Sequence, residues 1–79
     1  MRIRAEIHGA LERLQDGVPP GSRAIAPWLS ANERDALILL EDKGLQLTAD
    51  LLGITPDALG SWRRRRRQRK ERLRALERA

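Results

Sequence analysis

Helix-breaking residues divide this 79-residue chain into short segments, and they constrain its fold more than any other feature. Glycine or proline occurs repeatedly within 17–21, and again at Gly44, Gly53 and Pro56. Between these points, apolar residues recur every three or four positions, which is the periodicity of a helix with one buried face. A chain of this length forms one small domain. We therefore expect a single all-α domain.

The breaks predict a small four-helix domain that ends in a long basic helix. The consecutive prolines at 19 and 20 make residues 18–29 a connector, because proline lacks a backbone donor and disfavours helix before it. The expected parts are an N-terminal helix within 1–17, this connector, a core of 30–64 and a basic helical extension of 65–79. The predicted helices span Ile3–Gln15, Ala31–Lys43, Leu47–Leu52 and Pro56–Leu76.

Capping patterns locate the ends of these helices. Ser30 followed by Glu33 has the spacing of a capping box and predicts the start of the second helix. Gly44 should stop that helix. Thr55 and Pro56 suit the cap and the first position of the fourth helix.

The second helix contains four consecutive apolar residues, Leu37–Leu40. Such a run covers more than one face of a helix, so we expect packing on two sides, with a dimer face as the alternative. Asp35, Glu41 and Asp42 are interpreted as the solvated face of the same helix.

The segment Leu45–Arg64 has the spacing of a helix-turn-helix. This motif needs a small residue where the helices cross, a glycine in the turn, and apolar residues on the inner faces. Here Ala49 is the small residue and Gly53 is the turn. The apolar positions are Leu52, Ile54, Leu59 and Trp62.

On these residues, the segment resembles the helix-turn-helix units of bacterial and phage repressors. With Leu29-Ser-Ala-Asn-Glu-Arg34 before it, the chain is also similar to the C-terminal domains of LuxR-type regulators and to sigma factor region 4. The resemblance covers about 36 residues. It departs from those families at Thr48, where they usually have Ile or Val, and in the density of the arginine run.

The resemblance implies that the fourth helix reads the major groove of DNA. Leu59 and Trp62 should then point inward, and the outward residues should contact bases or phosphates. The expected DNA-binding residues are Thr55, Asp57, Ala58, Ser61, Arg63, Arg64, Arg65, Arg67 and Gln68.

Charge is divided sharply along the chain. Residues 1–60 carry six basic and nine acidic side chains, a net charge of −3, whereas residues 61–79 carry ten basic and two acidic, a net charge of +8. The positive charge of residues 61–79 predicts binding to a polyanion. Arginine binds phosphate well because its planar guanidinium donates two parallel hydrogen bonds. Double-stranded DNA is the expected partner.

One stripe of the fourth helix contains Leu59, Trp62, Arg66, Arg69, Leu73 and Leu76. We expect the two distal leucines to pack on the first helix of the same chain or on a second copy, and a homodimer is the favoured assembly.

Other classes of function have little support. There is no cysteine, and His8 has no partner at ligand spacing, so we expect no metal, cofactor or catalytic site and no small-molecule substrate. We expect no membrane partner. We expect the protein to be cytoplasmic and associated with the nucleoid. Two alternatives stay open: an arginine-rich RNA binder, and a module that docks on a polymerase or another enzyme.

Overall fold

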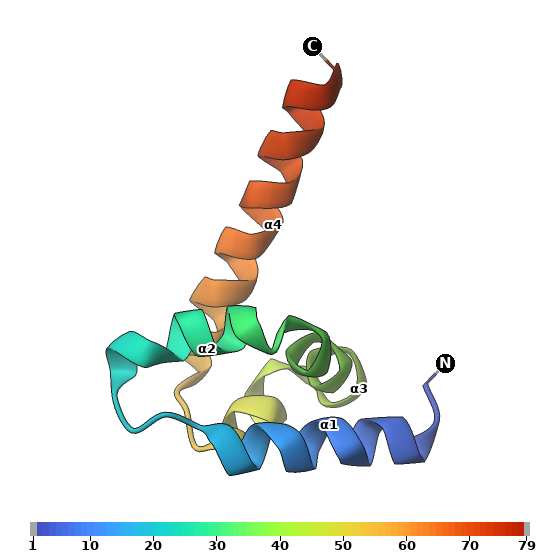
Figure 1. Cartoon of the computed structure of the whole chain (residues 1–79), viewed down its shortest axis with the longest axis vertical. Coiled ribbons are helices and arrows are strands. Elements are labelled where there is room, and N and C mark those ends of the chain that lie inside the picture. The colour runs from blue at the N-terminus through green and yellow to red at the C-terminus, as the bar shows by residue number, and fades with distance from the viewer. Residues whose placement is uncertain (1, 79) are drawn as a thin grey trace.

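The computed structural model describes residues 2–78 and is all-α. It contains α1 (Arg4–Gly17), a short 3-10 helix η1 (Ser22–Ala24), α2 (Ile25–Ala31), α3 (Glu33–Leu52) and α4 (Pro56–Arg78). α1, α2, α3 and the start of α4 form a body, from which the rest of α4 projects (Figure 1). The all-α fold class, with four helices and a long basic last helix, is confirmed.

Gly44 divides α3 into two straight segments. Its backbone has φ of 83° and ψ of 172°, values that a residue with a side chain rarely adopts. The predicted helices 31–43 and 47–52 are therefore the two halves of α3, and the predicted stop at Gly44 is confirmed. Thr48 is fully buried just beyond the break, and its hydroxyl donates to the carbonyl oxygen of Leu39 at 3.1 Å. The bond gives the buried hydroxyl a partner and links the two halves of α3.

Gly53 makes the turn into α4. Its φ is 71°, and its amide and that of Ile54 bond back to the last turn of α3, to Asp50 and Ala49. The hydroxyl of Thr55 then accepts a hydrogen bond from the amide of Ala58 at 3.1 Å, which caps the next helix. The predicted turn and cap are both confirmed.

The core has two parts, and the apolar run of α3 serves both. Ile38 and Leu39 pack against Ala10 and Leu14 of α1. Leu40 packs on the other side, against α2 and α4. The buried residues of that cluster are Ile25, Leu29, Ala36, Leu40, Ala49, Leu59 and Trp62. The expectation that this segment is packed on two sides is confirmed.

The predicted connector was wrong from residue 22 onward, because η1 and α2 occupy it. Pro27 is the third residue of α2. The first amides of a helix have no carbonyl partner within the helix, so a proline there removes no hydrogen bond. The prolines at 19 and 20 do precede the helical turns, as expected of a connector.

The predicted capping box was also wrong. Ser30 lies inside α2, and α3 begins at Glu33 after Asn32, which makes no side-chain cap. Instead, the side-chain amide of Asn32 donates to the carbonyl oxygen of Trp28 at 2.9 Å and closes α2. Ser30 and Glu33 instead contact side chains of α4.

The interpretation of Asp35 as a solvated residue was wrong. Arg13 of α1 donates two hydrogen bonds to its carboxylate, from Nε at 2.9 Å and from Nη2 at 2.8 Å. The Asp35 side chain is only 14% exposed. These hydrogen bonds outweigh the opposing effect of burial and lower the pKa of Asp35 from its ordinary value.

Replacing Asp35 with Asn should flatten the loss of stability in acid. A carboxylate whose pKa is lower in the folded chain stabilises the fold above its unfolded pKa of about 3.9, and this contribution disappears as the pH falls through the folded value. Urea denaturation at pH 6.5 and pH 3 should show a smaller difference for D35N than for the wild type. The exposed Asp50→Asn is the control and should keep the wild-type difference. An unchanged difference in D35N would contradict this role of the ion pair.

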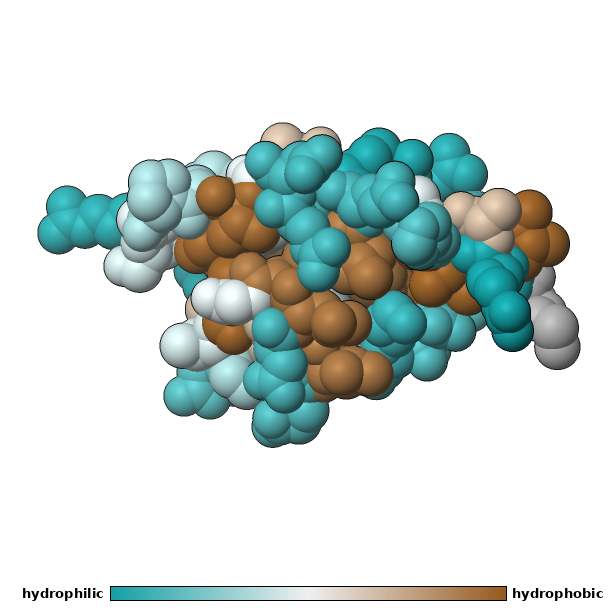
Figure 2. All heavy atoms as spheres, turned by 90° about the horizontal axis from the view of Figure 1, so that it is seen from below, coloured by the Kyte–Doolittle hydropathy of each residue, from teal (hydrophilic) through white to brown (hydrophobic). Residues whose placement is uncertain are grey.

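The end of the body away from the projecting helix is partly apolar. Figure 2 looks at this end, and hydrophobic side chains gather across its centre between polar ones. α4 thus leaves the body from the end opposite this apolar surface.

Candidate nucleic-acid interface

The first part of α4 is fixed to the body by two buried side chains and two polar contacts. Leu59 is fully buried and Trp62 is 5% exposed, so both point inward as predicted. The indole Nε1 of Trp62 donates to the hydroxyl of Ser30 at 3.0 Å, and Arg66 forms an ion pair with Glu33. Ser30 and Glu33, expected as a helix cap, therefore hold α4 against α2 and α3.

Beyond Arg66, α4 projects from the body (Figure 1). We call residues 67–78 the arm; every one of them is exposed. Leu73 and Leu76 are 53% and 68% exposed. The alternative that they pack on α1 of the same chain was therefore wrong.

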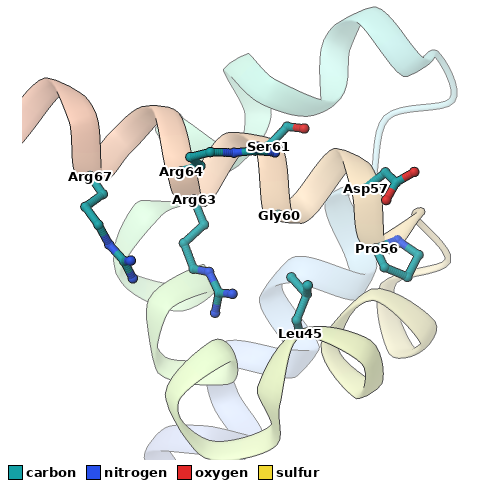
Figure 3. A pocket seen from close by; sticks show the side chains of 8 residues that line it. All are labelled: Leu45, Pro56, Asp57, Gly60, Ser61, Arg63, Arg64 and Arg67. Atoms are coloured by element: carbon teal, nitrogen blue, oxygen red, sulfur yellow. The ribbon is translucent and has the colours of Figure 1, made fainter.

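A groove of about 560 Å³ lies between α4 and the second half of α3. Leu45 lies at its base, and Arg63 and Arg67 point from α4 across it, while Arg64 lies back along the helix toward Ser61 (Figure 3). Gly60 lies opposite Leu45, and a β-carbon placed there would come within 3.6 Å of a Leu45 methyl. The groove is thus a polar channel lined by arginine on one wall.

A second groove, of about 450 Å³, lies on the other side of α4, against α2. It is lined by Ala26, Pro27 and Ser30 of α2, by Glu33 of α3, and by Trp62, Arg65, Arg66 and Arg69 of α4. Arginine therefore lines both flanks of α4. Arg63 and Arg67 form the α3-side row, and Arg65 and Arg69 form the α2-side row.

Cations flanking a helix on both sides suit a ligand with two lines of negative charge. A planar guanidinium binds phosphate in bidentate fashion, and exposed arginines keep their side chains free to reorient. The Glu33 carboxylate neutralises Arg66 within the body, so that arginine is the least available of the run.

The structure places the predicted site residues on one helix but on different faces. Asp57, Arg64, Arg65, Arg67 and Gln68 are exposed, and Ser61 and Arg63 are half-buried. Ala58 packs against the core cluster, so its prediction as an outward residue was wrong. Thr55 is exposed, but its oxygen is already engaged as the helix cap.

Sequence reasoning left Arg69 out of the predicted site and missed the place of Ser30 beside it. The periodic stripe through Leu59 and Trp62 had already placed Arg69 toward the body side of α4. The contribution of α2 to the groove had no signal in the sequence, because that helix was interpreted as a connector.

The remaining candidate chemistry is sparse. Within residues 2–78, no group of three or more His, Cys, Asp or Glu side chains is arranged to hold a metal ion. His8 is exposed and contacts only Glu12, at 2.7 Å, among the acidic side chains. No helix in this part of the chain is both long enough and apolar enough to cross a membrane.

Comparison with protein-family models, with curated proteins and with solved structures finds no match to this chain.

Proposed function

We propose that this protein binds double-stranded DNA with sequence preference and acts as a transcriptional repressor or related regulator of bacterial, phage or mobile-element type. The second half of α3, the Gly53 turn and α4 would be its helix-turn-helix. The observation that carries the proposal is the basic lining on both flanks of α4, next to residues 1–60, whose net charge is −3. The role is binding rather than catalysis, in the cytoplasm on the nucleoid.

The distribution of charge favours a duplex over a flat anionic surface. A helix is about 10–12 Å across with its side chains, and the major groove of B-DNA is about 12 Å wide. A helix inserted there meets a phosphate backbone on each side. The α3-side row would supply cations to one phosphate backbone and the α2-side row to the other. A single basic face would supply only one of them.

Titration of a labelled duplex tests the proposal. Fluorescence anisotropy should show binding at 50 mM salt that weakens steeply by 200 mM, because each phosphate contact releases a condensed counterion. Selection from a random duplex library should then enrich a preferred site. Absence of duplex binding at 50 mM salt would sink the proposal.

We propose that two copies bind together, with Leu73 and Leu76 as the surface by which they pair. Both leucines are exposed on the arm, at heptad spacing with Leu59 and Trp62. A palindromic selected site and a dimer mass on DNA, both lost in L73S/L76S, would support pairing. A single half-site bound by one copy would contradict it.

One alternative has a specific observation behind it. The arm is basic around its whole circumference, which would also suit an RNA hairpin. Tighter binding of a structured RNA than of the duplex, at the same salt, would favour that reading over DNA.

A further inference from the structure

The face of α4 opposite the body is defined by its buried residues. Leu59, Trp62 and Arg66 face the body. A residue two positions further along a helix points about 200° away, since each residue turns the helix by about 100°. Ser61, Arg64 and Gln68 therefore lie on the opposite face. Asp57, two positions before Leu59, begins the same line, and we call these four residues the outer ridge.

The outer ridge runs between the two basic rows. Arg63 and Arg67 point across the α3-side groove, which Asp57, Ser61 and Arg64 of the ridge also line, and Arg65 and Arg69 line the α2-side groove. If the rows meet the two phosphate backbones of a major groove, the ridge between them faces the base edges. Phosphate contacts position a protein, and only the ridge residues would read sequence.

Two residues of the ridge are long, exposed and able to make paired hydrogen bonds. Neither Arg64 nor Gln68 has a hydrogen bond or ion pair with another side chain in residues 2–78. Asp57 and Ser61 are shorter, and Ser61 is half-buried. Thr55 and Ala58 are off the ridge, one used as the cap and the other packed on the core.

We propose that Arg64 and Gln68 determine the sequence preference of this protein by reading a guanine and a nearby adenine. This rests on the proposed function. Arginine is bidentate to guanine O6 and N7, and glutamine is bidentate to adenine N6 and N7. Four residues of helix rise about 6 Å, and base pairs are about 3.4 Å apart. The two purine positions should therefore lie within about two base pairs of each other.

The test compares the same conservative substitution on the ridge and on a flank. The random-duplex selection is run with wild type, Arg64→Lys, Arg67→Lys and Gln68→Ala. R64K keeps the charge but loses the planar fork, so the salt dependence should stay and discrimination at the guanine should fall by about 5- to 150-fold. Q68A should relax the adenine alone. R67K, on the α3-side row, should leave both preferences unchanged.

The outcomes separate this assignment from the proposed function. Wild-type binding with no preferred guanine, or an R64K variant that keeps the full preference, overturns the assignment and leaves duplex binding standing. The same holds if R67K shifts the preference as much as R64K does. A wild-type chain that binds no duplex at 50 mM salt overturns both. Circular dichroism at 222 nm should show the same helix content in all variants, because these positions are exposed.

Discussion

Replacing Arg65 and Arg67 with alanine should weaken binding to every duplex sequence alike. One residue comes from each basic row, and each is exposed. Loss of two phosphate contacts should lower the slope of log affinity against log salt by about 1.8. If this electrostatic part vanishes near 1 M salt, binding should be weaker by about 20-fold at 200 mM and about 200-fold at 50 mM.

The matched control removes the same charge from the body. Arg4 and Arg23 are exposed, and neither contributes to the grooves beside α4. Their double alanine variant has the same net charge as R65A/R67A. Anisotropy titrations across 50–200 mM salt should leave its slope near that of wild type. Equal losses in the two double variants would mean that net charge, and not the rows beside α4, governs binding.

Replacing Leu59 with alanine should cost about 2–5 kcal/mol of folding free energy. Leu59 is fully buried where α4 meets α2 and α3, among Leu40, Ala49 and Ile25. The substitution leaves a cavity that the surrounding helices fill only in part. Since small domains have about 5–15 kcal/mol in total, the variant should lose a large share of its stability. Urea denaturation followed by tryptophan fluorescence measures the loss.

Leu76→Ala is the control for this experiment. The same side chain is removed from the arm, where it is 68% exposed, so stability should change by less than about 0.5 kcal/mol. Comparable losses at Leu59 and Leu76 would contradict the assignment of α4 to a docked first part and a free arm.

The parts of the fold that could be predicted depend on local backbone preferences. Gly44 and Gly53 adopt positive φ, which only glycine does readily, so their positions show in the sequence. Thr55 caps α4 through its own side chain. Leu59 and Trp62 are three apart and share the buried face of the helix, as helical periodicity requires.

The parts that could not be predicted depend on residues far apart in the chain. Pro27 removes no hydrogen bond at the start of α2, but in the sequence alone it indicates the end of a helix. Ser30 fits a local cap, yet its partner is Trp62, 32 residues away. Asp35 has the sequence pattern of an exposed acid, and only the packing of α1 on α3 places Arg13 beside it.

The candidate site divides in the same way. The arginine run can be recognised from the sequence alone, and so can the residues that belong to it. Their sorting into two rows needs the structure, because it depends on α3 and α2 lying on either side of α4. Ala58 illustrates this, since a count along the helix placed it outward and the structure packs it against the core cluster.

The net charge of −3 on residues 1–60 and of +8 on residues 61–78 also makes the molecule, whose longest dimension is 41 Å, a permanent electric dipole. In the field of a polyanion, such a molecule experiences a torque as well as an attraction. It should arrive with α4 leading and the body trailing, so more of its random encounters begin in a productive orientation. The same separation holds residues 1–60, with their net charge of −3, away from the phosphates once binding has occurred.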